Sequence, residues 1–170
     1  MKRLKSGFTL IEILVVVAIL AILATTVAYF VGIGPLRQAL FGRAKVELRN
    51  IAQATLLSVQ DYGDYPPDAD RDLPPGVEKY LSGHEWPKAP WTGSVYDWDN
   101  WVDPDTGRPI YQISIRFCPY GQPNLCEFPK EEWAKDFDYY SSVYYCIEGA
   151  CRSHISQPVN HPGLCVNCPQ

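Results

Sequence analysis

Charge is almost absent from residues 8–30 of this sequence. Between residues 8 and 24 the only ionisable side chain is Glu12, and apolar character continues to about residue 30. A run of this length argues against an ordinary secretory signal peptide, whose apolar core has about 7 to 15 residues, and it is long enough to span a bilayer. A carboxylate in such a segment costs about 2.5 to 3.5 kcal/mol on insertion scales, so Glu12 indicates a functional contact.

Cysteine is absent from the first 117 residues. An even number of cysteines gathered in one region indicates disulfides in an oxidising, extracytoplasmic space. The first pair that we expect is Cys118 with Cys126, because the intervening prolines and glycine favour a tight loop. The candidate disulfide cysteines are Cys118, Cys126, Cys146, Cys151, Cys165 and Cys168.

Zinc is the alternative for the last four of these cysteines. Their spacing, Cys-x4-Cys and Cys-x2-Cys, also fits a four-thiolate site, with His154 or His161 as alternative ligands in place of a thiolate. An exported location favours disulfides over zinc.

Other functional patterns are sparse as well. The three histidines, His84, His154 and His161, fall in unrelated loops, and no nucleophile, base and orienting group can be assembled, so we expect no enzyme. Beyond the N-terminal cations, no basic patch is interleaved with aromatic residues, so nucleic-acid binding is not indicated.

Three of the fifteen basic residues precede the apolar run. Lys2, Arg3 and Lys5 predict a cytoplasmic N-terminus by the positive-inside rule. The chain is thus predicted to cross the membrane once, with its head outside.

The residues Gly7-Phe8-Thr9-Leu10-Ile11-Glu12 follow this basic leader. They closely resemble the cleavage and methylation motif of type IV pilins and type II secretion pseudopilins. The resemblance implies that a prepilin peptidase cuts after Gly7 and methylates Phe8, and that the helix remains as both anchor and assembly surface. It also implies an inner-membrane assembly platform and an assembly ATPase as partners.

The resemblance supplies a partner for Glu12. In a filament of staggered parallel helices, the cationic amine of Phe8 in one subunit can approach Glu12 of a neighbour, where low dielectric strengthens the attraction. The alternative is that Glu12 lies near the cytoplasmic interface and extends its carboxylate toward water.

A second helical segment is predicted after a break at residues 31–35, where Gly32, Gly34 and Pro35 weaken helix formation. The break is a kink, an unwound stretch or a loop. Gly63 is the predicted stop signal. An apolar stripe at spacings of three and four indicates an amphipathic helix, with Leu36, Leu40, Ala44, Leu48, Ile51, Thr55 and Val59 on one face.

The predicted domains are a leader at 1–7, a transmembrane and assembly helix at 8–30, an amphipathic helix at 31–62 and an extracytoplasmic head at 63–170. In the head, residues 110–117 alternate strictly and predict a strand, residues 137–147 predict a second and 95–98 a short third. One helical turn is expected at 76–81. The predicted class is α+β: a long N-terminal helix under a small antiparallel sheet, with a loop-rich, disulfide-bearing C-terminal region.

The near part of the head is similar to that of major pseudopilins, through Gly63-Asp64-Tyr65-Pro66 and Trp86-Pro87-Lys88-Ala89-Pro90-Trp91. The cysteine-rich tail from Cys118 departs from the usual pseudopilin, which leaves pilus and secretion assignments both open.

Two further patterns have competing interpretations. Asp97, Asp99, Asp103 and Asp105 could bind Ca²⁺, although their spacing is not that of an EF-hand, or could serve turns and caps. The tryptophans could form a glycan-binding face or, more commonly, the core. These tryptophans are Trp86, Trp91, Trp98, Trp101 and Trp133.

The sequence therefore predicts a structural subunit that polymerises through its N-terminal helix into a type IV pilus or type II secretion pseudopilus. The alternative is a membrane-anchored minor pilin or surface-binding protein whose head recognises a ligand without forming the bulk filament.

Overall fold

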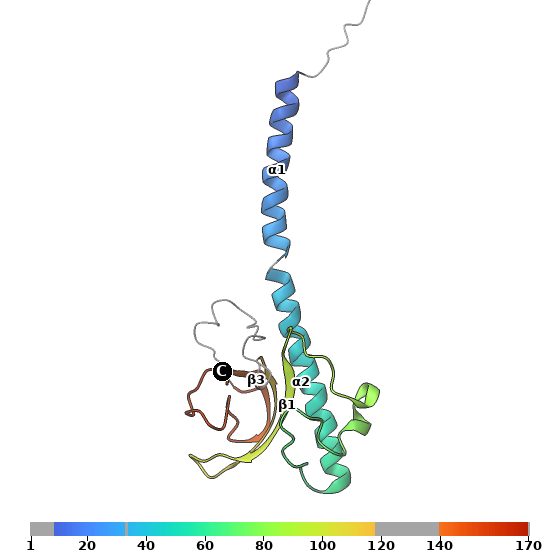
Figure 1. Ribbon diagram of the computed structural model, residues 1–170, viewed down its shortest axis with the longest axis vertical. Coiled ribbons are helices and arrows are strands. Elements are labelled where there is room, and N and C mark those ends of the chain that lie inside the picture. The colour runs from blue at the N-terminus through green and yellow to red at the C-terminus, as the bar shows by residue number, and fades with distance from the viewer. Residues whose placement is uncertain (1–8, 33, 118–139, 170) are drawn as a thin grey trace, which may run out of the picture. The chain divides into compact units, whose positions relative to one another are not determined.

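A computed structural model describes residues 9–32, 34–117 and 140–169 (Figure 1). The chain divides into two compact units, residues 1–38 and 39–170. The first contains helix α1 (Leu10–Gly32), and helix α2 (Gly34–Tyr62) begins in the first unit and continues into the second. The break predicted at 31–35 includes Ile33, which lies outside the described residues.

Helix α1 is apolar on every side. All described side chains from Leu10 to Val27 are exposed, and this stretch is long and apolar enough to cross a membrane. Its two threonines bond locally: the hydroxyl of Thr25 donates to the Ile22 carbonyl at 2.8 Å, and that of Thr26 to the Leu23 carbonyl at 2.9 Å. The predicted membrane-length helix is confirmed as a helix.

Helix α2 is amphipathic as predicted. Ala44, Leu48, Ile51 and Thr55 are all buried at the expected spacings. The helix ends at Tyr62, and Gly63 adopts a φ of +91° while its N–H donates to the Val59 carbonyl at 2.7 Å. Glycine adopts this left-handed conformation without steric cost, which confirms Gly63 as the stop.

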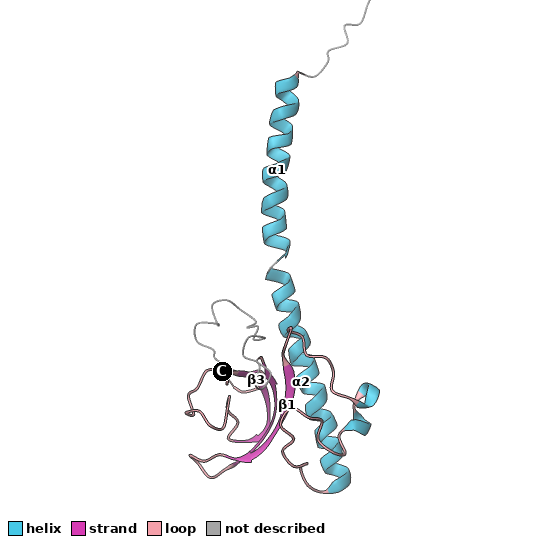
Figure 2. Cartoon of the chain, in the orientation of Figure 1, coloured by secondary structure: helices cyan, strands magenta, loops and turns pink. Residues whose placement is uncertain are grey.

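The sheet has four strands in the order β1 (Val95–Val102), β2 (Pro109–Arg116), β3 (Ser142–Gly149) and β4 (Gly163–Cys165). Figure 2 colours the strands magenta and the helices cyan. The predicted strands at 95–98 and 110–117 are confirmed, and β1 is longer than predicted. The strand predicted at 137–147 corresponds to β3, although residues 137–139 lie outside the described part of the chain.

The prediction of a wholly antiparallel sheet is wrong in one pair. Strands β1, β2 and β3 pair antiparallel, but β4 pairs parallel to β3. The sequence did not predict β4, because this strand has only three residues, too few to show alternation. It also reaches the sheet after an irregular connection, so its direction could not be predicted. The short helices η1 (Glu78–Tyr80) and η2 (Ser82–His84) correspond to the helical turn expected near residues 76–81.

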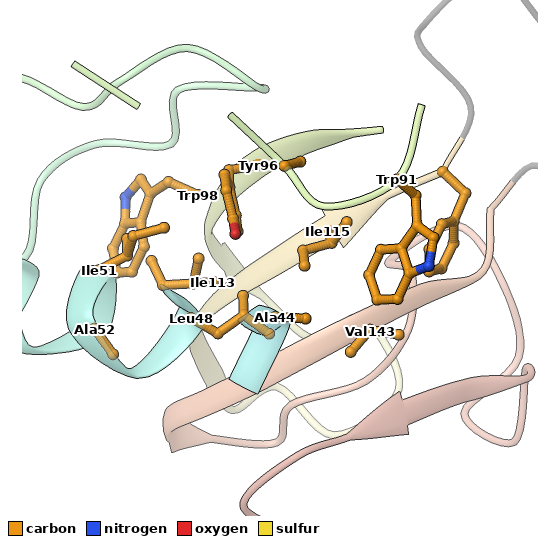
Figure 3. Close-up of a cluster of buried hydrophobic side chains, with 12 residues drawn as sticks. Ala44, Leu48, Ile51, Ala52, Trp91, Tyr96, Trp98, Ile113, Ile115 and Val143 are labelled. Carbon is orange, nitrogen blue, oxygen red and sulfur yellow. The ribbon is translucent and has the colours of Figure 1, made fainter. Parts of the chain in front are cut away.

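One face of the sheet packs on α2. In Figure 3, Leu48 and Ile51 of α2 face Ile113 of β2 and Trp98 of β1. These four side chains are completely buried. Burial of each such apolar side chain contributes about 1.5 to 3 kcal/mol.

The tryptophans of the head mainly belong to this core. Trp91 and Trp98 are buried, and Trp86 packs against the same cluster. The Trp91 ring lies 5.2 Å from that of Phe117, measured between centroids, in an edge-on arrangement. Trp101 is half-buried, and Trp133 lies outside the described residues.

The opposite face of the sheet is buried too, although its side chains are polar. Gln112, Ser114 and Arg116 alternate with the apolar residues of β2, and all three are buried. Residues 152 and 153 of the C-terminal region bond to this face. The head therefore has an apolar layer on one side of the sheet and a polar layer on the other.

Candidate functional site

The first turn of α1 carries a reciprocal pair of hydrogen bonds between Thr9 and Glu12. The Thr9 backbone N–H donates to Glu12 Oε2 at 2.7 Å, and the Thr9 hydroxyl donates to the same oxygen at 2.8 Å. The Glu12 backbone N–H lies 3.3 Å from Thr9 Oγ1. This Thr-x-x-Glu arrangement is a capping box, which satisfies N–H groups that have no partner inside the helix.

Sequence reasoning missed this local partner of Glu12. The signal was present, because a threonine three residues before a glutamate at the start of an apolar run is typical of a helix N-terminus. A carboxylate at this position is also favoured by the helix dipole. Gly7 and Phe8 lie outside the described residues, so the cleavage and methylation positions and the pairing of Phe8 with Glu12 stay predictions.

In the head, Arg116 forms the centre of a buried charge cluster. Its Nε donates to Asp97 Oδ2 at 2.8 Å, and its Nη2 donates to Asp99 Oδ1 at 3.1 Å. All three side chains are nearly inaccessible to solvent. Burial by itself lowers the pKa of Arg116, but the charges of Asp99 and Asp97 outweigh it and raise that pKa.

Polar neighbours complete this cluster. The side chains of Gln112 and Ser114 each donate to Asp99 Oδ2 at 3.0 Å. Arg116 Nη1 donates to the Ser153 carbonyl at 2.6 Å, which fastens the C-terminal region to β2. Buried charges are stable only when they are paired and hydrogen-bonded in this way.

A second cluster surrounds Arg152. Its Nη1 donates to Asp103 Oδ1 at 3.1 Å and also to the carboxylate of Asp105. Its Nη2 donates to the carbonyls of Ile155 at 2.7 Å and Gln157 at 2.8 Å. Burial raises the pKa of Asp103, but hydrogen bonds from the Asp105 N–H and other neighbours, with the Arg152 charge, hold it below its usual range.

The four aspartates predicted as calcium ligands are thus divided between two arginines. Asp97 and Asp99 contact Arg116, whereas Asp103 and Asp105 contact Arg152. Within residues 9–32, 34–117 and 140–169, no group of three or more acidic, histidine or cysteine side chains is placed to hold a metal ion. Calcium binding stays a prediction, and the arrangement favours guanidinium groups as the partners of these carboxylates.

Four of the six candidate cysteines form two local disulfides, Cys146–Cys151 and Cys165–Cys168. The exported location predicted disulfide-bonded cysteines. Zinc binding by these four cysteines would first require reduction of both disulfides. Cys118 and Cys126 lie outside the described residues, so their pairing stays a prediction.

The histidines are not arranged around a common site. His84 ends η2, while His154 and His161 lie in the C-terminal region. His154 Nδ1 accepts from the Ser156 N–H at 3.1 Å, and its ring lies 4.7 Å from that of Tyr140. Burial and the nearby charge of Arg116 lower the pKa of His154 to about 4.

Comparison with known proteins identifies the N-terminal segment. Residues 2–28 match a family model described as the prokaryotic N-terminal methylation motif. This motif is the signature of type IV pilins and pseudopilins, so the chain carries the N-terminus of a pilin-like subunit. No curated protein and no solved structure matched the chain.

Proposed function

We propose that this protein is a structural subunit that polymerises through its N-terminal helix into a type IV pilus or a type II secretion pseudopilus. The observation that carries the proposal is the combination of the methylation motif with a helix whose described apolar side chains are all exposed. Such a surface is unstable in water, and a membrane or the helices of neighbouring subunits would cover it.

Processing would prepare the helix for assembly. A prepilin peptidase would cut the leader after Gly7, and methylation of the new N-terminus would retain a cationic amine on Phe8. The cut removes Lys2, Arg3 and Lys5, so the formal charge of −4 becomes −7. An assembly platform and an ATPase in the inner membrane would then add the subunit to the filament, with its head outside the cytoplasm.

Glu12 can serve the cap and the filament together. Both hydrogen bonds from Thr9 use Oε2, and a carboxylate has several lone-pair sites on its two oxygens. The other oxygen, Oε1, can therefore accept from the Phe8 amine of an adjacent subunit. In this arrangement, the cap orients the carboxylate before assembly.

Mass spectrometry of the protein purified from its native membrane tests the proposal. The expected N-terminal peptide begins at a singly methylated Phe8. A chain that retains Met1, or one that begins at Ser6 without methylation, would overturn the proposed processing. A correctly processed chain that stays monomeric in the presence of the assembly machinery would instead support the membrane-anchored alternative.

A further inference from the structure

The disulfide Cys165–Cys168 closes a four-residue ring that begins at the last residue of β4. Strand β4 has only three residues, and its last register pair joins Cys165 to Tyr144 of β3. Beyond it, the Val166 N–H donates to the Tyr144 carbonyl at 2.9 Å. Because parallel pairing is slightly weaker than antiparallel pairing, so short a strand depends on the contacts that follow it.

The next contact comes from inside the ring. Asn167 uses its side chain as a second strand would use its backbone: Oδ1 accepts from the Cys146 N–H at 2.8 Å, and Nδ2 donates to the Cys146 carbonyl at 2.7 Å. Cys146 is itself bonded to Cys151. This Asn167 clamp therefore connects the two disulfide rings.

The two sulfurs of the Cys165–Cys168 ring are not equivalent. The Cys168 backbone N–H donates to Cys165 Sγ at 3.1 Å. A hydrogen bond from an N–H group stabilises a thiolate and lowers its pKa, and a thiolate of lower pKa leaves faster in thiol–disulfide exchange. Cys165 is therefore the better leaving group, and Cys168 is the sulfur that an incoming thiolate should attack.

We propose that Cys165–Cys168 is a thiol–disulfide exchange site for an extracytoplasmic dithiol oxidoreductase, and that its reduction releases the Asn167 clamp from β3. The proposal rests on the location of the head in the proposed function. A partner thiolate attacks Cys168 Sγ and forms a mixed disulfide, while the bond to Cys165 breaks and Cys165 leaves as a thiolate. The second partner thiolate then attacks the partner's own sulfur, and Cys168 leaves with the bonding electrons and is protonated by water.

The electron balance of this exchange is complete. Two electrons pass from the partner dithiol, which becomes a disulfide, to the sulfurs of Cys165 and Cys168, which become reduced. The other disulfide is held differently, because both backbone groups of Arg152, next to Cys151, are bound by the buried side chain of Gln112, at 3.1 and 2.8 Å. We therefore expect Cys146–Cys151 to stay closed while Cys165–Cys168 opens.

The first experiment follows reduction of the full chain in detergent micelles. Samples exposed to dithiothreitol without denaturant are alkylated at intervals and mapped by mass spectrometry. Cys165 and Cys168 should become labelled about tenfold faster than Cys146 and Cys151. With glutathione in place of the dithiol, the trapped adduct should lie on Cys168. Equal or reversed rates, or an adduct mainly on Cys165, would overturn the proposal.

The second experiment tests the clamp. If reduction releases it, then Asn167→Ala should shift the exchange equilibrium with dithiothreitol toward the reduced ring by about fivefold, the worth of an ordinary hydrogen bond. Asn160→Ala is the control, because Asn160 is an exposed asparagine outside the ring. In the wild-type chain, reduction should also accelerate hydrogen exchange at the Cys146 amide.

An Asn167→Ala equilibrium equal to that of the wild type, or a Cys146 amide that stays protected after reduction, would contradict release of the clamp. Both readouts use purified protein and need neither cleavage of the leader nor a filament. Their failure is therefore distinguishable from failure of the proposed assembly.

Discussion

The guanidinium of Arg116 donates from Nε to Oδ2 of Asp97 across 2.8 Å, and solvent reaches only 4% and 6% of the two side chains. This ion pair joins neighbouring strands on the polar face of the sheet. It also lies where the C-terminal region is fastened, because the same guanidinium donates to the Ser153 carbonyl. The polar layer is thus held together by charges that have little access to water.

Arg116→Met is expected to destabilise the head by about 3 to 5 kcal/mol, because it leaves Asp97 and Asp99 buried without their cation. Chemical unfolding of the chain in detergent, followed by tryptophan fluorescence, measures this loss. Arg43→Met is the control, since the ion pair of Arg43 with Glu47 is partly exposed and is worth less than about 1 kcal/mol. Equal losses in both variants would contradict a special role for the buried pair.

Chelation should leave the head unchanged. The carboxylates of Asp97, Asp99 and Asp103 already have arginine partners at hydrogen-bonding distance, so guanidinium groups take the place of a bound cation. We expect the same melting temperature in EDTA and in millimolar CaCl₂ at constant ionic strength. A rise in melting temperature with calcium, absent with magnesium, would instead support the calcium site predicted from the sequence.

Acid should weaken the head through His154. The folded state lowers the pKa of this imidazole from 6.5 to about 4, so the unfolded chain binds the extra proton first as the pH falls. The part of the folding stability that depends on a neutral His154 is fully present above pH 6.5 and is lost as the pH falls from about 6.5 to 4. With allowance for solvent screening, the free energy of unfolding decreases by roughly 1 to 2 kcal/mol over this range.

Unfolding curves for the wild type and His154→Gln across this pH range measure the effect. The variant should show a smaller decrease in stability toward pH 4. His84→Gln is the matched control, because His84 is exposed on η2. If His84→Gln flattened the pH dependence as much as His154→Gln, the assignment to His154 would be wrong.

Gly149 occupies a position that no other residue fits. Its φ is +96°, and a Cβ placed there would lie 1.8 Å from the Pro109 carbonyl oxygen. Gly149→Ala should therefore cost at least about 2 kcal/mol of stability. Gly42→Ala should do the reverse and stabilise α2 by about 0.5 to 1 kcal/mol, since nothing lies within 4 Å of its added Cβ. Thermal unfolding of both variants separates conformational strain from a general effect of adding a methyl group.

The apolar face of the head could be predicted from sequence because its periodicity is strong. Ala44, Leu48 and Ile51 repeat with the period of a helix, and Ile113 and Ile115 repeat with that of a strand. The polar face could not be predicted in the same way. Alternation separates the two faces of β2, but it does not tell whether water or another part of the chain covers Gln112 and Arg116.

The polar cluster nevertheless left a trace in the sequence. Asp97 and Asp99 alternate on β1 with the same period as the polar residues of β2, so opposite charges could have been matched across the strands. Without Arg116, the four aspartates fit either calcium ligands or residues that serve turns and caps. Pairing with the C-terminal region was beyond reach, since Ser153 lies 37 residues from Arg116 in an irregular segment.

At the N-terminus, the motif around Gly7 could be recognised from its residues, whereas the capping role of Thr9 was missed. The reason is that the charge of Glu12 in an apolar run indicates an intermolecular partner, whereas only the Thr-x-x-Glu spacing indicates the local one. The two roles make different demands on the side chain. A cap needs a hydrogen-bond acceptor, whereas attraction to an amine in low dielectric needs the negative charge.

Glu12→Gln separates these roles, because glutamine keeps the acceptor of the capping box but loses the charge. We expect both Glu12→Gln and Glu12→Ala to enter the membrane normally and to reduce filament yield at least about tenfold, the effect of an interaction near 1.4 kcal/mol. Thr9→Ala removes the capping hydroxyl but keeps the charge of Glu12, so it should reduce the yield less. Electron microscopy and quantification of sheared filaments provide the measurement, with membrane fractionation as the control for insertion. Normal filaments from Glu12→Gln would show that the cap alone suffices and would refute pairing between Glu12 and the Phe8 amine of a neighbouring subunit.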